Sequence, residues 1–348
     1  MKPNLLSPLL LLLGLTNLGA IENSIIPQMN QCRQLSSLQL DKYPTALQEE
    51  IREALQHTGD CLRIATYNVL FSGHDDQLAW RDRWPQRLPR LVETIRNIDP
   101  DILAVQELLS EQLDDLQSLL KDCFNVYVPS APYGELNCVF YRSDRLELLK
   151  GTTVILCDKP RLMSDSLTIV QLMDRQTGLP IALFNTHLPF HSIDWQVDHA
   201  RKIADHLREA AQSMPTVFCG DLNTFATLLD RPTLPLYGGE YVERILSASG
   251  VQDARLHALV GHLGPLGTFT SHNDRRLKAK PFSGFGVPGV ILDHIYVSAS
   301  VHVLVHGIET ATVGGEFGSD HMPVVIDCLV DTRFQVPGIL SGEAAAMP

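Results

Sequence analysis

The sequence predicts an α/β protein in which two mixed sheets pack face to face and helices flank them. Two stretches share one plan: an apolar strand ends at a polar residue, a helix follows, and a second apolar strand ends in a carboxylate. The first stretch runs from Arg63 to Glu107 and the second from Ile181 to Asn223. Further strand-like runs lie between and after them, and this strand count suits neither a simple parallel sheet nor an all-β sandwich.

Each element is predicted from its local pattern. Pro85 or Pro89 opens the first helix, because proline loses no hydrogen bond in a first turn. Ser110 is the expected N-cap of the second helix, and the third has an apolar face between Ile193 and Ala211. Apolar runs bounded by turn residues predict the strands. These strands are residues 63–70, 102–106, 124–128, 137–142, 152–156, 167–173, 180–185, 216–219, 290–297, 301–305 and 324–329.

Length and composition fit one large domain. The chain has 348 residues, of which 45% are hydrophobic, and this is ample for a large core. We expect the domain to span residues 60–332, with residues 21–59 as a peripheral lead-in and residues 333–348 as a disordered tail. The net charge of −12 argues against a broad grip on duplex DNA, which needs a basic face, although it allows a locally positive cleft.

The N-terminus has the pattern of a secretory signal peptide. Lys2 precedes an apolar run from Leu5 to Leu18, and Ala20 offers a cleavage point. The run is too short to favour a membrane span. We therefore expect residues 1–20 to direct secretion or transfer to the periplasm, rather than to form an apolar helix of the fold.

A carboxylate ends the second predicted strand. Glu107 follows an apolar run that starts at Ile102, and only its neighbour Gln106 is polar there. A carboxylate in such a position is costly unless charged partners or a cation hold it. Mg²⁺ suits it, because this hard cation takes oxygen ligands, and Asn68 supplies an amide oxygen or N–H beside it. The alternative is a solvated carboxylate at a strand end.

The segment Gly220-Asp221-Leu222-Asn223 is the strongest single motif. Glycine permits close backbone approach to a ligand. Side chains alternate along an extended chain, so we expect Asp221 and Asn223 to point the same way. A carboxylate and an amide on one side can orient a water molecule and contact the phosphate that it attacks. The alternative is a strand followed by an Asx turn.

Histidines mark two other strand boundaries. His187 ends a strand and can donate to a phosphate oxygen, whereas zinc shared with His191 is not favoured, because no Cys or Glu joins the two. His321 directly follows Asp320 before an apolar run. Adjacent side chains diverge, so we expect Asp293 or a metal-linked carboxylate to orient His321 and to favour its protonated form.

These residues, in this order, resemble the endonuclease/exonuclease/phosphatase superfamily. That group includes pancreatic deoxyribonuclease, abasic-site endonucleases, polyadenylate-specific exonucleases, neutral sphingomyelinases and inositol polyphosphate 5-phosphatases. The resemblance covers nearly the whole span from Arg63 to Ile326, and its motifs are specific as a set. It implies a four-layer α/β sandwich, in agreement with the two packed sheets expected above, with residues 60–332 as the catalytic domain.

The resemblance also implies a role for each motif residue. Asn68 and Glu107 would bind the metal, Asp221 would orient or activate the attacking water, and Asn223 would contact the phosphate. The remaining catalytic positions are His187, Asp293, Asp320 and His321. Leu70 departs from the pattern of some endonucleases, which carry an acid there, and this weakens assignment to the abasic-site branch.

Four cations lie close together in this acidic chain. They are Arg275, Arg276, Lys278 and Lys280. Because glycines and the strand that carries Asp293 follow, we expect this loop to overhang the site and to bind phosphates beside the scissile one. The alternative is a solvated basic loop.

The resulting hypothesis is an exported Mg²⁺-dependent phosphodiesterase, with Mn²⁺ as a second suitable cation, that hydrolyses nucleic acid by in-line attack of water. One alternative is a hydrolase of phosphomonoesters or of phospholipid or sphingolipid head groups. Another is a secreted binding protein without turnover, which the intact set of motif residues argues against. The sequence shows no sign of an obligate protein partner.

Overall fold

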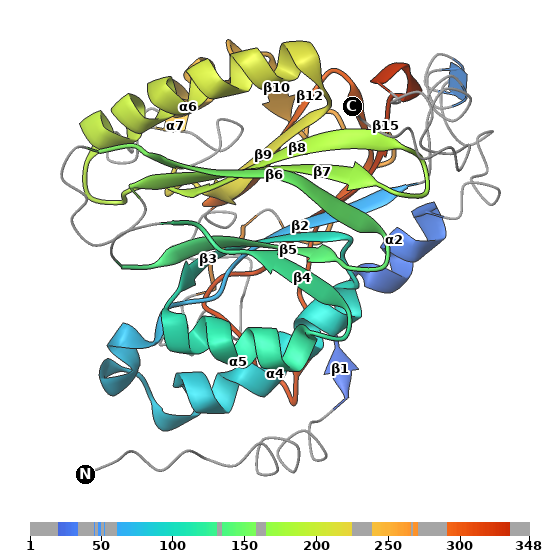
Figure 1. The fold of residues 1–348 in the computed structure, drawn as a ribbon. Helices are drawn as coiled ribbons and strands as arrows, with labels where there is room; N and C mark the ends of the chain where they lie inside the picture. The colour runs from blue at the N-terminus through green and yellow to red at the C-terminus, as the bar shows by residue number, and fades with distance from the viewer. Residues whose placement is uncertain are drawn as a thin grey trace, which may run out of the picture.

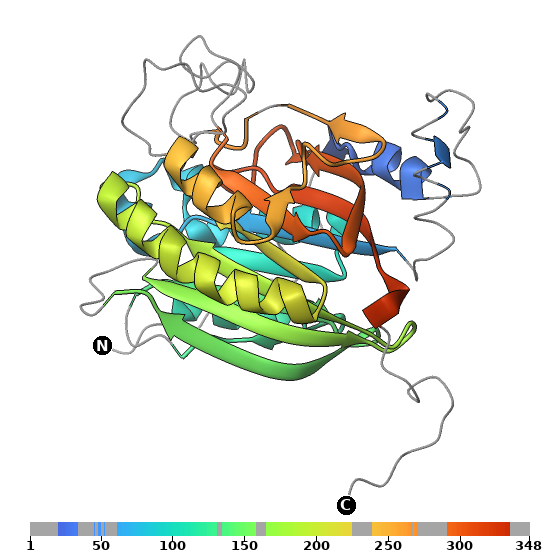
Figure 2. The same ribbon diagram turned by 90° about the horizontal axis from the view of Figure 1, so that it is seen from above.

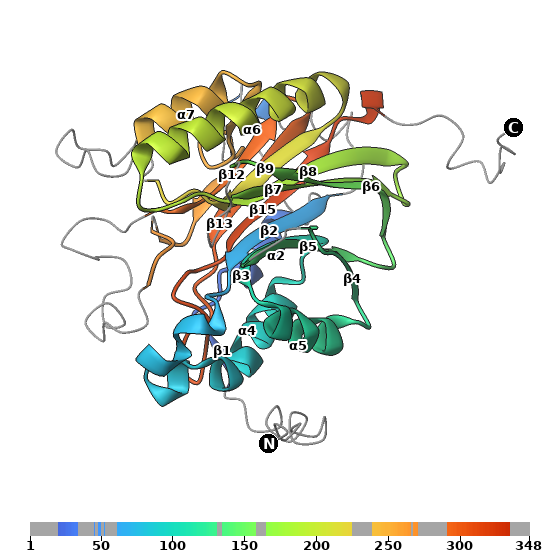
Figure 3. The same cartoon turned by 60° about the vertical axis from the view of Figure 1, so that its left-hand side comes forward.

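The computed structural model describes residues 20–33, 45, 48–49, 52, 61–130, 134–157, 165–224, 239–265, 267–270 and 291–334 of the chain. These residues form two large mixed sheets packed face to face, with helices on both outer faces (Figure 1). The predicted four-layer α/β sandwich is therefore confirmed. Figure 3 shows the layers in the order helix, sheet, sheet, helix.

The first sheet joins strands from both ends of the domain in the order β11-β13-β15-β2-β3-β5-β4. These strands are β11 (Gly261–Leu263), β13 (Val301–Ile308), β15 (Val324–Val330), β2 (Leu62–Asn68), β3 (Ile102–Leu108), β5 (Leu136–Arg142) and β4 (Phe124–Tyr127). A crossover through α4 (Trp84–Ile98) makes β2 and β3 parallel, and Asn68 is paired with Gln106 at their ends. α5 (Ser110–Leu120) packs beside α4 on the outer face (Figure 1).

The second sheet has the order β10-β12-β9-β8-β7-β6. Its strands are β10 (Val251–Asp253), β12 (Asp293–Ser298), β9 (Thr216–Asp221), β8 (Leu179–His187), β7 (Ser166–Asp174) and β6 (Leu146–Ile155). A crossover through α6 (Ile193–Ser213) makes β8 and β9 parallel, with His187 opposite Asp221. Figure 2 shows α6 and α7 (Gly239–Ser247) side by side over this sheet. Both predicted strand–helix–strand units are thus present.

Three apolar clusters hold the layers together. The largest lies between the sheets and includes Ile64, Leu183 and Val217, all of them fully buried. A second lies between the first sheet and α4, and a third lies between the second sheet and α6. Polar residues gather where the parallel strands end, and this end of the sandwich is the candidate site.

The structure differs from the sequence prediction in several local elements. α4 begins at Trp84 with Pro85 in its first turn, so Pro89 lies inside the helix. The N-cap of α5 is Leu109, because Ser110 is already helical. β6 is longer than predicted, and the sequence does not predict α7, β10 or β11, since segments this short show too little periodicity. The remaining short elements are β1 (Ile21–Glu22), β14 (Thr312–Val313), η3 (Ser72–Gln77), η4 (Trp80–Asp82) and η8 (Thr332–Phe334).

The described part of the expected lead-in is packed against the domain. β1 pairs with β14, and α2 (Ile26–Arg33) buries Met29 completely. A Cβ atom at Gly307 would lie 2.4 Å from the Ile25 Cδ1 atom, so glycine makes room for this segment. The expected signal peptide up to residue 19 and the tail beyond residue 334 lie outside the described residues. Among the residues described, no helix is long and apolar enough to cross a membrane.

Buried His306 meets half-buried His262 at an edge of the first sheet. The Nδ1 atoms of His262 and His306 are 2.8 Å apart, and His262 Nε2 lies 2.7 Å from the Pro265 carbonyl oxygen. A carbonyl oxygen only accepts, so His262 Nε2 carries the proton and His262 Nδ1 accepts from His306. Burial lowers the pKa of both imidazoles, and the nearby Arg255 guanidinium lowers both further. Both rings are therefore neutral in the folded protein.

This pair predicts a loss of stability in acid. A histidine whose folded pKa is lowered stabilises the fold fully above its unfolded pKa of about 6.5, and this contribution is lost as the pH falls through the folded pKa. His306→Asn keeps a donor near the Nδ1 position but does not titrate. Its Tm should therefore fall less than that of the wild type between about pH 7 and pH 5. Thermal unfolding at both pH values is the measurement, and an equal fall in the two proteins would contradict the assignment.

Candidate active site

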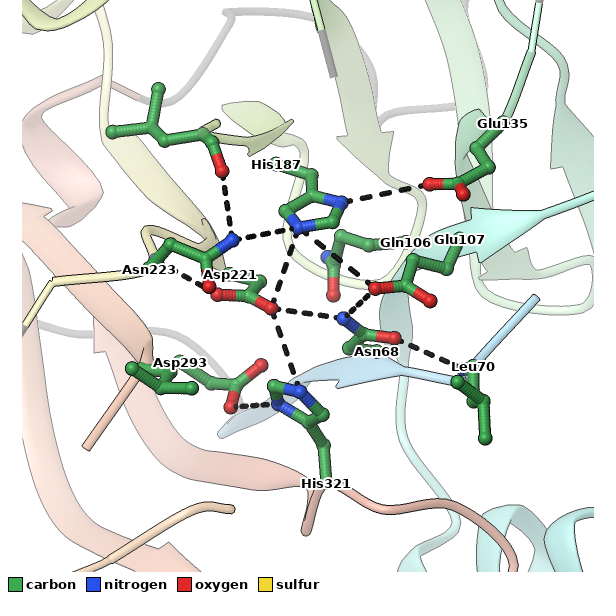
Figure 4. Close-up of polar contacts among 12 residues, drawn as sticks. Asn68, Leu70, Gln106, Glu107, Glu135, His187, Asp221, Asn223, Asp293 and His321 are labelled. Atoms are coloured by element: carbon green, nitrogen blue, oxygen red, sulfur yellow. Dashed lines mark hydrogen bonds and ion pairs between the residues drawn. The ribbon is translucent and has the colours of Figure 1, made fainter. Parts of the chain in front are cut away.

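Polar side chains from both sheets converge where the two parallel strand pairs end. Figure 4 shows them around one point between the sheets. The structure brings together Asn68, Glu107, His187, Asp221, Asn223, Asp293 and His321. The two strand–helix–strand units therefore converge on one site.

The amide of Asn68 connects the two halves of this site. Its Nδ2 atom donates to Glu107 Oε1 at 2.8 Å and to Asp221 Oδ2 at 2.9 Å. Its Oδ1 atom accepts from the Leu70 backbone N–H at 3.0 Å. The amide thus presents N–H groups to both carboxylates, while its oxygen is directed to Leu70. In this arrangement the Asn68 amide nitrogen positions the carboxylates of Glu107 and Asp221.

A local irregularity of β3 directs Glu107 into the site. The pairing of β3 with β5 shifts register between Val105 and Leu108, and Glu107 has a positive φ of 63°. A bulge of this kind changes the direction of a side chain relative to simple alternation. The Glu107 carboxylate accepts from Asn68 and, through Oε2, from the Phe71 backbone N–H at 3.1 Å.

The Gly220-to-Asn223 segment combines the two interpretations of its sequence. Asp221 Oδ1 accepts from the Asn223 backbone N–H at 2.8 Å, which is an Asx turn, and Asn223 has a φ of 48°. The expected extended geometry is therefore wrong, yet the turn still brings the Asn223 side chain to the site. Gly220 serves strand packing rather than ligand approach, because a Cβ atom there would lie 1.8 Å from the Thr186 carbonyl oxygen.

His187 lies between acids of both sheets. Its Nε2 atom is 3.6 Å from Asp221 Oδ2, 3.9 Å from Glu107 Oε1 and 2.9 Å from Asn223 Nδ2. An amide nitrogen only donates, so His187 Nε2 accepts and the ring proton is on Nδ1. Donation from Nε2 to a phosphate, as the sequence predicts, therefore requires a protonated ring.

His321 is oriented by Asp293, as expected. Asp293 Oδ2 lies 2.7 Å from His321 Nδ1, and the register of β12 on β9 places Asp293 opposite Asp221. Burial alone would lower the pKa of His321, but the carboxylates of Asp293 and Asp221 raise it well above its ordinary value. The ring is therefore an imidazolium at neutral pH. Asp320 does not join this pair: its carboxylate lies 3.3 Å from Ser319 Oγ.

Two further residues of the site lack a signal in the sequence. Glu135 Oε2 lies 3.8 Å from His187 Nδ1, and neither atom has a hydrogen-bond partner among the described residues. Burial, with the charges of Glu107 and Asp221, raises the pKa of Glu135 to about 9. Gln106 donates to Asn185 Oδ1 at 2.7 Å and so connects the two sheets beneath the site. A single acid or amide beside a strand has no distinctive spacing, so only the fold identifies these two.

Arg87 of α4 is the third missed residue. Its side chain is fully buried, and its guanidinium donates to the carbonyl oxygens of Val69, Leu70 and, at 3.4 Å, Gly318. It also lies over the Trp84 ring, 4.9 Å from the centroid. One cation thus joins the loop after Asn68 to the loop before His321. It holds Leu70 in its left-handed conformation, with the N–H directed to Asn68.

We predict that Arg87→Lys lowers kcat by roughly 10- to 100-fold, on the scale of a misplaced catalytic group, while KM changes little. A lysine ammonium cannot reproduce the planar fork that reaches three carbonyl oxygens. The matched control is Arg90→Lys, one turn further along the same helix, because Arg90 is also buried but donates to Arg81 instead. Steady-state kinetics below the Tm of each variant would decide, and equal losses in the two variants would show a structural role only.

The donor groups at the site fit a divalent cation. Ligand atoms of Glu107, His187 and Asp221 lie within 4.8 Å of one another. Burial, followed by the Asp293 charge, raises the pKa of Asp221 to about 6. In the part of the chain that the structure describes, no Lys or Arg pairs with these acids. Such buried carboxylates are costly without a compensating cation, and Glu107 is the ligand nearest to solvent, with 12% of its side chain exposed.

The predicted phosphate-binding residues cannot be placed in this geometry. Arg275, Arg276, Lys278 and Lys280 lie outside the described residues. Their role stays a prediction from the sequence.

A sandwich of two sheets with buried acids, a polarised histidine and donor groups that fit a divalent cation at the strand ends is suited to metal-dependent hydrolysis of phosphoesters. The sequence model of the Endonuclease/Exonuclease/phosphatase family matches residues 65–321, and the chain belongs to this family. Members of the family are hydrolytic phosphoesterases that depend on a divalent metal. The resemblance seen in the sequence is thereby confirmed.

Individual relatives are distant. The chain is 28% identical over 202 residues to Protein angel homolog 2 of Mus musculus, a match that covers 50% of this chain and only 36% of that protein. It is similar in structure to a mannosyl-6-phosphatase of Bacteroides thetaiotaomicron, with a TM-score of 0.63, 22% identity and coverage of 77% and 99% of the two chains. The human Nocturnin catalytic domain gives a TM-score of 0.55, 19% identity and coverage of 79% and 98%. These structural similarities establish the fold.

Proposed function

We propose that this chain is an exported divalent-metal-dependent phosphodiesterase that hydrolyses nucleic acid by in-line attack of water. The observation that carries the proposal is the position of Asp221 between two imidazoles. Its Oδ2 atom lies 3.6 Å from His187 Nε2 and 3.7 Å from His321 Nε2. A base, a cationic donor and the acid Glu107 therefore surround one point, which is the arrangement that phosphoryl transfer to water needs.

Asp221 is the group suited to accept the proton of the attacking water. With a pKa of about 6, raised by burial and then by Asp293, it is ionised at neutral pH and still basic enough to take a proton. The Asn68 amide and the Asn223 backbone N–H fix its two oxygens. The carboxylate therefore keeps one direction during turnover.

His321 is the group suited to stabilise the negative charge that develops on the phosphate. Asp293 holds its Nδ1 side, so Nε2 is directed toward Asp221 and the centre of the site. The amide of Asn223, which donates to the Leu188 carbonyl oxygen at 2.8 Å, lies on the opposite side next to His187. Glu107 with Asp221 or His187 would hold the cation, which supplies charge neutralisation at the phosphate when bound.

The charge of the site favours a phosphodiester over a phosphomonoester. A diester carries one negative charge near neutral pH, whereas a monoester approaches two. The described site offers two imidazoles, amides and a place for one divalent cation, without a Lys or Arg side chain. The alternative of a phosphomonoester or lipid head group stays open, since one of the similar structures is a mannosyl-6-phosphatase.

A substrate panel tests this proposal. With Mg²⁺ and separately with Mn²⁺, the purified protein should cleave single-stranded DNA or RNA with higher kcat/KM than p-nitrophenyl phosphate, sphingomyelin vesicles or inositol phosphates. A chelator should abolish every activity. Preference for a phosphomonoester or a lipid would replace the proposal by the alternative, and activity that survives excess chelator would exclude the metal mechanism.

We predict that Asp221→Asn lowers kcat by roughly 10²- to 10⁴-fold, the scale for loss of a general base. The amide has nearly the shape of the carboxylate, so KM for the oligonucleotide should be largely retained. Asparagine keeps one acceptor oxygen, so the variant retains only one of the two contacts, with Asn68 Nδ2 or with the Asn223 N–H, and its Tm is measured beside its kinetics. A variant that loses binding but keeps kcat would give Asp221 a structural role.

The proposal of export depends on the sequence pattern of residues 1–20 alone. Expression with this segment should give a processed protein outside the cytoplasm, and N-terminal sequencing of that fraction should begin near Ile21. An unprocessed chain confined to the cytoplasm would remove export from the proposal.

A further inference from the structure

An exposed aromatic group lies in the chain three residues after His187. Phe190 lies in the loop between β8 and α6, and 60% of its surface is exposed. Its ring meets the His191 ring edge to face, with centroids 5.4 Å apart, and His191 meets Trp195 in the same way at 5.1 Å. Aromatic pairs of this geometry are mutually stabilising. The three rings therefore form a connected aromatic surface.

Hydrogen bonds connect this aromatic surface rigidly to the site. The Leu188 N–H donates to the Asp221 carbonyl oxygen at 2.8 Å, and Asn223 Nδ2 donates to the Leu188 carbonyl oxygen at 2.8 Å. On the helix side, Gln196 Nε2 donates to the Asn223 carbonyl oxygen at 3.0 Å. Both ends of the loop that carries Phe190 are thus joined to the segment that carries Asp221.

Chain geometry limits the distance between Phe190 and the site. Phe190 is three residues after His187, and three residues span at most roughly 10–11 Å. Proteins that bind single strands stack successive bases on aromatic side chains that lie along the path of the nucleic-acid backbone. Phe190 is therefore within reach of a group one or two positions from the scissile phosphate.

The other half of the site has a corresponding aromatic residue. Phe71 is three residues after Asn68, and its ring meets the His74 ring edge to face with centroids 4.5 Å apart. Its backbone N–H donates to Glu107 at 3.1 Å. One aromatic pair therefore comes from the loops of each sheet. A phosphodiester has a group on each side of the phosphate, which matches this arrangement.

The acidic character of the chain makes such contacts useful. A net charge of −12 opposes long-range attraction of a polyanion. Stacking on a ring face does not depend on charge and is tolerant of sequence, since every base has a π-face. An exposed phenyl ring beside the site supplies this contact.

We infer that Phe190 forms a subsite that stacks an unpaired nucleobase next to the scissile phosphate of a single-stranded nucleic acid. The inference rests on the proposed nucleic-acid phosphodiesterase activity and specifies its substrate as unpaired rather than duplex. Phe71 supplies the corresponding contact on the other side of the phosphate. His191 and Trp195 support the Phe190 ring.

The test compares Phe190→Ala with the wild type on two oligonucleotides. One is an ordinary single strand with one defined cleavage site, and the other has abasic positions on both sides of that site. Phe190→Ala should lower kcat/KM on the ordinary strand by roughly 5- to 150-fold, the scale measured for loss of one stacked base. On the abasic strand the two proteins should be equal. Phe190→Trp should retain the wild-type rate on the ordinary strand.

Two controls separate stacking from a general apolar contact. Phe190→Leu keeps apolar area without a π-face and should behave like Phe190→Ala. Leu149→Ala removes a side chain on β6 that is 50% exposed. This position is remote from the site: its neighbour Leu148 pairs with Leu172 of β7, and Leu172 pairs with Ile181 of β8, six residues before His187. It should leave kcat/KM unchanged on both strands.

The outcomes distinguish the inference from the function on which it rests. Cleavage of the ordinary strand with equal rates for wild type and Phe190→Ala overturns the subsite alone. Equal losses on the ordinary and abasic strands also overturn it, since the effect would not depend on the base. Failure of the wild type to cleave any nucleic acid overturns the proposed function and the subsite together. If Phe190→Ala lost activity on sphingomyelin vesicles while Phe190→Leu retained it, the side chain would contact a membrane instead of a base.

Discussion

The site depends on one amide placed between two buried carboxylates. Glu107 belongs to the first sheet and Asp221 to the second, and like charges at this depth would repel each other without a donor between them. Asn68 Nδ2 donates to both. Its orientation follows from the Leu70 N–H on its oxygen, and Leu70 is in turn held by Arg87. The relative position of the two sheets at their functional end is thus set by a short chain of hydrogen bonds.

The site contains more acidic than basic side chains, and the protein compensates only part of their negative charge. The His321 imidazolium compensates Asp293 and partly Asp221, whereas Glu107 has only neutral donors and the unprotonated nitrogen of His187 near it. This leaves a local negative potential that attracts a divalent cation and disfavours an anionic substrate in its absence. Metal and substrate are therefore expected to bind in a coupled way, with the metal creating the affinity for phosphate.

Sequence periodicity was sufficient for the strands of four or more residues and the three long helices, because apolar runs and helical stripes are local signals. It also located Asn68, His187, Asp221 and Asp293, since each ends or begins a strand. Arg87, Glu135 and Gln106 could not be found, because their partners are distant in sequence and known only after folding. Gly220 was misinterpreted for the same reason: the steric neighbour that requires glycine is the backbone of β8.

The backbone of Glu107 has an evolutionary consequence. A left-handed conformation at a residue other than glycine costs on the order of 1–3 kcal/mol, and glycine or asparagine would adopt the φ of 63° more readily. The proposed role of Glu107 in holding the cation would account for a carboxylate at this bulge. A descendant freed from catalysis would gain stability by exchanging this one residue. The residue at position 107 of such a descendant would therefore indicate whether selection has acted on turnover or only on folding.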